Sequence, residues 1–454
     1  MAQSDAAFDE YRLDIPLEDP LEGLDERLDG GAASGGSGEA GPSEADRPSI
    51  ASVALDVILT PIGIAVIVGL ATLASLAAAG RRRQQARLGR PRTGRRGRRS
   101  TMLGALLAMT AVAATGCGGG AGASDDPFFG VQPRSNPEAD DFARMADAGV
   151  GTYRVFVSWV DVQKEADAPF DWSRVDPVMV RLAFNDIEPL VYFAGVPGWL
   201  ADDRRDSPVA SQRSREAVGA FIAAAVGRYG PDSTFWRQLQ DSELELTPKP
   251  VRTWQIWNEQ NSSFAWRPKA SVDEYRELLT IAATAIRSVD PDARIMSGGM
   301  FGTPPARGSI KSWRFARELL SDAETRELVD VVGIHPYSPS IDGVRFQVRE
   351  VRKALADSGA ADLPLWVTEI GWGSSERGGL MVGLQGQAEM LTEAFSMFER
   401  NRERWILEGV VWFSWRDDRR LPGRNVFDGS SGLLTDAGEA KPAFGRYRDA
   451  AAGD

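Results

Sequence analysis

The chain of 454 residues contains a single cysteine, Cys117, and a single histidine, His335. An internal disulfide therefore cannot form, and a zinc site built from cysteines and histidines is excluded. A catalytic triad with a cysteine nucleophile would require these two residues to meet. The chain also lacks a surplus of basic residues, because its formal net charge is −12. Phosphate neutralisation needs a basic surface, so we expect no nucleic-acid partner.

The amino-terminal segments lack the composition of a packed domain. Residues 1–50 are acidic and rich in glycine and serine, which predicts a disordered acidic tail. Residues 51–80 include an uncharged apolar run from Val57 to Gly80, a candidate transmembrane helix for a hydrocarbon layer of roughly 30 Å. The arginine-rich segment 81–100 follows, and the positive-inside rule predicts that it is cytoplasmic.

A second apolar run occupies residues 101–117 and has the pattern of a signal peptide: arginines, a short apolar stretch and small residues before Cys117. It resembles a bacterial lipoprotein signal, although Ala114 stands where leucine or valine is usual. This resemblance implies lipid attachment at Cys117, a flexible tether over 118–126, and a chain exported to the bacterial cell surface or the extracellular space, tethered to the membrane.

Two consecutive export signals leave two interpretations open. In the first, the run from Val57 to Gly80 is a true anchor with the amino terminus outside. In the second, translation starts further along the chain and residues 1–90 or so are not made. The sequence does not distinguish them.

From residue 127 to 454 the pattern changes to short β-prone runs that alternate with amphipathic stretches. One such stretch begins at Ser271 and Glu274, a capping box, and stops at Pro291. Eight strands followed by helices predict an α/β fold, the (β/α)8 TIM barrel, with its longest insertion over 199–250. The eight runs are 128–132, 151–159, 188–195, 251–259, 293–302, 329–337, 363–372 and 408–417.

Polar residues end several of these strands, where barrels of this kind carry their functional groups. The run WQIWNEQN places Asn258 and Glu259 at the end of the fourth strand, and WVTEIGW places Glu369 at the end of the seventh. Two facing carboxylates in an aromatic cleft suit the cleavage of a glycosidic bond. One donates a proton to the leaving oxygen, and the other attacks the anomeric carbon.

These residues resemble those of the clan A retaining glycoside hydrolases, the (β/α)8 enzymes around families 5 and 39, which include cellulase-like and β-xylosidase-like proteins. In that resemblance Asn258 and Glu259 match the pair that ends strand four, whose glutamate is the acid/base. Glu369 matches the nucleophile that ends strand seven. The resemblance covers residues 125–454 and implies hydrolysis of β-linked glycans by double displacement.

Further residues match the family as substrate-binding or orienting groups. Arg154 matches an arginine on strand two, the HPY motif supplies His335 and Tyr337 on strand six, and Trp415 matches a strand-eight tryptophan that stacks on the sugar. The resemblance implies that Arg154 and Tyr337 keep Glu369 ionised and that Asn258 binds the sugar 2-hydroxyl. It implies an oligo- or polysaccharide as partner, and no metal or organic cofactor.

This mechanism makes two physical demands. A retaining enzyme needs its carboxyl groups about 5–5.5 Å apart. The acid/base Glu259 must be protonated near neutral pH, above its free pKa of ~4.3. We expect partial burial and the charge of Glu369 to raise the pKa of Glu259.

Ordinary interpretations exist for the same residues. Glu259 could be a surface glutamate, Asn258 a turn former and His335 a hydrogen-bonded core residue. The tryptophans at 199, 266 and 372 fit loop packing as well as sugar platforms. Two other functions use the same barrel: a surface glycan-binding protein that has lost turnover, and a transglycosylase with a sugar acceptor in place of water.

Overall fold

The computed structural model describes residues 127–453, except 135–136, 241–245, 377, 419–426 and 428. The predictions for residues 1–126 lie outside this part of the chain, including the membrane helix, the arginine-rich segment, the signal-like segment and Cys117. Within the described residues, none of the helices combines the length and the apolar character needed to cross a bilayer.

Eight parallel strands form a closed barrel in which each pairs with its neighbours in chain order and β8 pairs with β1. All eight strands predicted from the sequence are present. The predicted (β/α)8 barrel is therefore confirmed. The strands are β1 Phe129–Gln132, β2 Thr152–Ser158, β3 Glu188–Ala194, β4 Thr253–Asn258, β5 Arg294–Phe301, β6 Val332–His335, β7 Leu365–Ile370 and β8 Leu407–Phe413.

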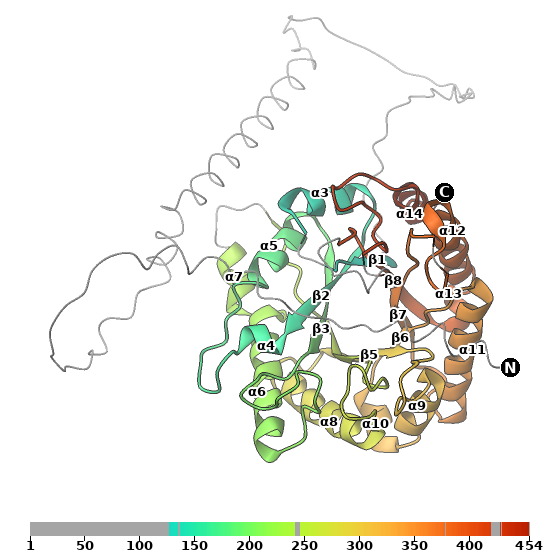
Figure 1. Cartoon of the computed structure of the whole chain (residues 1–454). Coiled ribbons are helices and arrows are strands. Elements are labelled where there is room, and N and C mark those ends of the chain that lie inside the picture. The colour runs from blue at the N-terminus through green and yellow to red at the C-terminus, as the bar shows by residue number, and fades with distance from the viewer. Residues whose placement is uncertain are drawn as a thin grey trace, which may run out of the picture. The chain divides into compact units, whose positions relative to one another are not determined.

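At least one helix follows each strand, and the helices surround the barrel (Figure 1). The predicted insertion between β3 and β4 contains a long helix, α6, and a short one, α7. The helices are α3 Ala139–Asp147, α4 Trp159–Val162, α5 Asp176–Phe184, α6 Gln212–Tyr229, α7 Thr234–Gln240, α8 Val272–Val289, α9 Ser312–Leu320, α10 Ala323–Leu328, α11 Ile341–Asp357, α12 Gly383–Arg400, α13 Arg402–Trp405 and α14 Pro442–Ala451.

The strands separate an apolar shell from a mixed interior. On β2, Val155 and Val157 are buried in the core between strands and helices. The alternate residue Arg154 points into the barrel, because successive side chains of a strand face opposite sides. A small apolar cluster of Leu190, Met296 and Val331 is separate from the main core. Leu190 pairs in register with Arg154, so this cluster fills the interior beside a polar layer.

Helix α8 shows how local sequence sets an element's start. The Ser271 side chain accepts a hydrogen bond from the backbone N–H of Glu274, as the predicted capping box requires. The second half of that box is not formed. The carboxylate of Glu274 instead accepts from the indole of Trp266 at 2.8 Å, which attaches the loop after β4 to the helix. A tertiary contact has replaced only the Glu274 half of the local cap.

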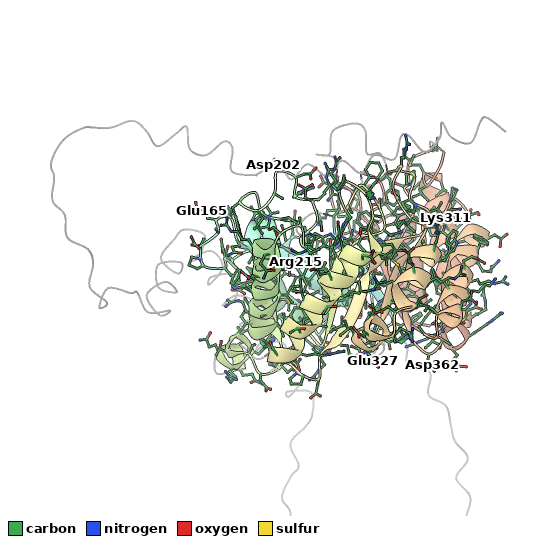
Figure 2. The ribbon with its side chains drawn as sticks, turned by 90° about the horizontal axis from the view of Figure 1, so that it is seen from below. Glu165, Asp202, Arg215, Lys311, Glu327 and Asp362 are labelled. Carbon is green, nitrogen blue, oxygen red and sulfur yellow. The ribbon has the colours of Figure 1, made fainter. Side chains whose placement is uncertain are left out.

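The two ends of the barrel are distinct (Figure 2). Glu165, Asp202 and Lys311, which lie in connections that follow strands, are near one end, and Glu327 and Asp362, which precede strands, are near the other. The first end is the one where carboxyl ends of all parallel strands converge. Polar residues that end the strands are therefore brought together there.

Candidate active site

Two glutamates and the only histidine meet at the carboxyl end of the barrel. Glu259 follows β4, His335 ends β6 and Glu369 lies in β7. One carboxylate oxygen of each glutamate and a ring nitrogen of His335 all lie within 4.8 Å of one another. The glutamates are 6% and 7% exposed, so both carboxylates are largely removed from water. This separation fits a retaining pair, not the ~6.5–9.5 Å of an inverting pair.

Arg154 organises the charges beneath the carboxylates. Its guanidinium is buried and donates to Glu369 and to the side-chain oxygen of Gln132. It also donates to Gln255 at 2.8 Å and to Asn258 at 2.7 Å. Its charged plane lies 3.8 Å from the ring centroid of Tyr192. One always-charged group thus neutralises Glu369 and orients three neighbouring amides.

A chain of hydrogen bonds connects Arg154 to Glu259 through neutral groups. Gln255 accepts from Arg154 and donates to the hydroxyl of Thr368 at 3.1 Å. That hydroxyl lies 3.0 Å from Nε2 of His335, and Nδ1 lies 3.0 Å from Glu259. If Thr368 donates to Nε2, the ring proton is on Nδ1 and points to the Glu259 carboxylate. In that arrangement the network holds a neutral imidazole with its proton on Nδ1.

The electrostatics of the buried groups agree with this assignment. Burial, together with the nearby Arg154 charge, holds the pKa of His335 well below its usual value of 6.5. Burial raises the pKa of Glu369 above the ordinary carboxyl value, while Arg154 and hydrogen bonds from Tyr337 and Gln132 oppose this rise. A neutral histidine therefore lies beside a carboxylate whose ionisation depends on one arginine.

Tyr337 and Asn258 lie where the sequence predicts. The Tyr337 hydroxyl donates to Glu369 at 3.1 Å, on the second carboxylate oxygen. The side-chain oxygen of Asn258 accepts from Arg154. The amide nitrogen of Asn258 is then the group that can donate to a substrate hydroxyl. Both residues are brought to the carboxylate pair, although their roles toward a substrate stay predictions.

The backbone around Glu259 adopts an unusual conformation. Glu259 and Trp257 both have positive φ angles, 48° and 72°, in the region that L-residues rarely occupy. The N–H of Glu259 donates to the carbonyl of Gly299 at 3.0 Å, which attaches this turn to β5. Such conformations cost on the order of 1–3 kcal/mol and concentrate at functional sites. Gly299 itself is required, because a Cβ there would lie 2.0 Å from Nε2 of His335.

The prediction for Trp415 needs correction. Its ring is fully buried and packs against Phe444 of α14 at 5.9 Å, so it offers no face to a sugar. The prediction assumed that β8 continues to residue 415. The strand ends at Phe413, and the alternation of side chains does not extend past it.

Phe413, the last residue of β8, contributes to an aromatic group near the carboxylates. It is 7% exposed and stacks on Phe427 at 5.9 Å. Phe427 in turn meets Tyr337 edge-on at 5.6 Å, and Tyr337 bonds to Glu369. These three rings form an aromatic wall beside the nucleophile position. Trp412 faces away from this wall, against Trp372 and Phe395.

The other tryptophans considered as platforms lie in packed surroundings. Trp266 and Trp372 are fully buried, which supports loop packing for both. Trp199 is half-buried, its indole donates to the backbone of Gln163, and the Arg213 guanidinium lies 5.3 Å from its ring centroid.

Several site residues were missed in the sequence. Gln132, Gln255 and Thr368 carry the polar network, and all three are buried polar residues within apolar strands. A polar residue that interrupts an apolar strand is a usable signal, because a buried polar group needs hydrogen-bond partners. Tyr192 was the harder case. Nothing in EPLVYFA marks the ring that lies on Arg154.

The cluster of Glu259, His335 and Glu369 is also the one group among the described residues with the composition and spacing to hold a metal ion. The arrangement favours proton transfer instead. Arg154 already neutralises Glu369, and Nδ1 of His335 is at hydrogen-bond distance from Glu259. A cation would displace both interactions.

Comparison with known proteins supports the chemistry implied by this geometry. Residues 230–440 match the family model described as glycosyl hydrolase catalytic core. The chain is 24% identical over 249 residues to a β-xylosidase of Geobacillus stearothermophilus. That match covers 48% of this chain and 44% of the relative, so the chain spans less than half the length of the relative it matches.

Solved structures share the fold at low identity. A family 39 glycoside hydrolase from Bacteroides cellulosilyticus WH2 superposes with a TM-score of 0.54 at 20% identity, covering 73% of this chain and 64% of that one. A GH5_18 from Bifidobacterium longum subsp. infantis gives 0.54 at 17% identity, covering 71% and 78%. The fold is therefore that of glycoside hydrolases of families 5 and 39, as the resemblance implies.

Proposed function

We propose that this barrel is a retaining glycoside hydrolase that cleaves β-linked glycans with Glu369 as nucleophile and Glu259 as acid/base. The observation that carries the proposal is the closeness of the two carboxylates: one oxygen of each lies within 4.8 Å of the other, and Arg154 is paired with only one of the two groups. Two carboxylates in different surroundings suit two different roles. The match to a glycosyl hydrolase catalytic core supports the same reaction class.

The reaction follows from these positions in two steps. Glu369 attacks the anomeric carbon, the bond to the leaving oxygen breaks, and Glu259 gives that oxygen its proton. The product is a glycosyl ester on Glu369. Glu259, now ionised, takes a proton from water, whose oxygen attacks the anomeric carbon and releases the Glu369 carboxylate. Both glutamates return to their starting protonation states.

The surrounding residues serve the two steps in separate ways. Arg154 and Tyr337 hold one carboxylate oxygen each of Glu369, which keeps it ionised and aimed. Nδ1 of His335 lies 3.0 Å from Glu259, and the imidazole, being neutral, can exchange a hydrogen bond with this carboxyl group in either protonation state. Asn258 would donate to the sugar 2-hydroxyl, where hydrogen bonds strengthen in the transition state.

The test is reducing-sugar release by the purified full-length protein on a panel of β-linked glycans, beside Glu259→Gln and Glu369→Gln. The panel begins with β-xylosides, since a relative carries the name β-xylosidase. We expect release by the wild type, a large loss in both variants, and a β-configured first product in a proton NMR time course. An α-configured first product would contradict the retaining assignment.

Two other outcomes would select another function. Binding of a glycan without release of product would favour a glycan-binding protein. Products longer than the substrate, with little free reducing sugar, would favour a transglycosylase, which uses the same glutamates with a sugar acceptor in place of water.

We also propose that the barrel is exported and tethered to the bacterial membrane through a lipid on Cys117 or through the apolar segment before it. The support is the order of the sequence: a signal-like run, the only cysteine and a glycine-rich tether before the barrel. Labelled palmitate should enter the wild type but not Cys117→Ser. Equal labelling of both proteins would contradict lipid attachment at this residue.

A further inference from the structure

Phe156 is exposed in a place where the barrel would normally bury it. It lies within β2, between Val155 and Val157, which are 3% and 0% exposed, yet 41% of its own surface is accessible. Its neighbours face the helix shell, so Phe156 faces the interior, on the same side as Arg154. A residue inside a barrel strand reaches solvent only through an open mouth. The barrel is therefore open above Phe156.

The Phe156 ring belongs to a stack that ends at the nucleophile. It lies nearly parallel to Tyr192, with centroids 5.0 Å apart and an interplanar angle of 18°. Tyr192 is its partner in register on β3, and the Arg154 guanidinium lies on the Tyr192 ring at 3.8 Å. Arg154 is paired with Glu369. The Tyr192 ring thus contacts both the accessible Phe156 ring and the Arg154 guanidinium that pairs with Glu369.

The Tyr192 ring, on which Phe156 stacks, is held in position. Tyr192 is buried, and its hydroxyl lies 3.2 Å from the amide nitrogen of Gln132, which also bonds to Arg154. Because Tyr192 cannot shift without disturbing these bonds, the orientation of Phe156 is set from below. An aromatic ring that is fixed in orientation and 41% exposed is suited to a flat apolar ligand surface.

We propose that Phe156 is the platform of a second sugar subsite, next to the subsite that holds the sugar attacked by Glu369. The ligand is the apolar C–H face of a neighbouring pyranose ring in a β-linked oligosaccharide. This inference rests on the proposed function, since it takes the sugar chain from the glutamate pair. It goes further by assigning contact with a second sugar ring to a named side chain on β2.

Position separates Phe156 from the other exposed phenylalanines. Phe184 ends α5 and is 62% exposed, and Phe346 lies in α11 and is 54% exposed. Both belong to the outer helix layer, and neither contacts a residue of the catalytic network. Phe156 is the exposed aromatic that continues directly from that network. Phe184→Ala therefore provides a matched control for loss of an exposed phenyl ring.

The experiment compares one-ring and multi-ring substrates in the full-length protein. The one-ring substrate is the β-glycosyl fluoride of the sugar that the panel identifies, because its leaving group carries no ring. The multi-ring substrate is the β-linked trisaccharide of the same sugar. We expect Phe156→Ala to raise KM for the trisaccharide about 10-fold, the size of one lost aromatic contact, with the fluoride unchanged within about twofold. Phe156→Trp should restore the trisaccharide KM.

Each remaining outcome overturns the inference in a recognisable way. An equal loss on both substrates would make Phe156 a support for Arg154 and not a sugar platform. No change on the trisaccharide, or the same change in Phe184→Ala, would remove the subsite. Absence of any wild-type activity on the panel, with folding intact by circular dichroism, would instead refute the proposed function itself.

Discussion

Two ion pairs cross the barrel, one at each end, and their surroundings differ. At the carboxyl end, Arg154 of β2 pairs with Glu369 of β7, with side chains 0% and 9% exposed. At the amino end, Arg294 of β5 pairs with Glu408 of β8 at 2.7 Å through two hydrogen bonds, with side chains 40% and 31% exposed. The chemical groups are the same. The exposure of the two pairs to water differs greatly.

That difference separates a functional pair from a structural one. Water screens the exposed pair, which therefore contributes at most about 1 kcal/mol to stability. The buried pair has given up hydration that its mutual attraction repays only in part, so it is a poor device for stability. Burial instead makes the charge on Glu369 sensitive to every neighbour. The chain keeps the buried Arg154–Glu369 pair, despite its loss of hydration, at the end where the strand-end residues converge.

Removing the carboxylate charge at each end gives the largest contrast. We expect Glu369→Gln to lower kcat by at least about 10⁴-fold, because no nucleophile remains to form the glycosyl ester. The matched change Glu408→Gln should leave kcat unaltered and change the free energy of unfolding by less than about 1 kcal/mol. Initial rates on the best panel substrate and urea unfolding measure both. Comparable activity losses in the two variants would mean that the carboxyl end is not the reacting end.

The second contrast lies within the carboxyl end, between its two glutamates. We expect Glu259→Gln to lower kcat/KM on an oligosaccharide by about 10²–10⁴-fold, the usual contribution of a general acid. A β-glycosyl fluoride needs no proton on its leaving group, so the first step on that substrate should continue in this variant. A burst of fluoride release measures it. An absent burst would assign Glu259 a role other than proton donation.

Arg154 tests whether one charge sets the ionisation of the nucleophile. Burial raises the pKa of Glu369 and Arg154 lowers it, so Arg154→Gln should raise that pKa further. Glu369 reacts when ionised, and activity falls as pH drops below its pKa. The acid limb of kcat/KM should therefore move to higher pH, with a loss of about 10²–10³-fold at the optimum. In Arg294→Gln the limb should stay in place.

The barrel fold could be predicted from the sequence because the strand pattern and the helix pattern indicate the same architecture. Eight apolar runs of strand length alternate with helical stretches, and every run became a strand. The carboxylate pair was also predictable, since parallel strands bring their carboxyl ends together. Once the strands were located, the positions of five site residues at or just after strand ends followed: Asn258, Glu259, His335, Tyr337 and Glu369.

The errors come from contacts that have no local signature. Trp415 was assigned by its resemblance to a strand-eight tryptophan, but β8 ends at Phe413 and the chain leaves the sheet. Glu274 was assigned to a helix cap, yet it bonds to Trp266. The stack of Phe156 on Tyr192 depends on strand register, which one sequence does not reveal. Tertiary partners decided these cases, and a residue's own neighbours in sequence did not.

The single histidine gives the smallest and cleanest test of the contrast between the buried and the exposed ends. The pKa of His335 is well below 6.5 in the folded chain, whereas the unfolded chain has an ordinary histidine. Between these two values the unfolded state binds one proton more, so the free energy of unfolding falls as pH drops below about 6.5. The slope should approach about 1.4 kcal/mol per pH unit. His335→Gln has no imidazole to titrate. The unfolding free energy of both proteins, measured with urea across pH, therefore separates the histidine contribution from that of the carboxylates. Parallel profiles would show that the imidazole titrates as freely in the barrel as in water, and the neutral relay to Glu259 would then be wrong.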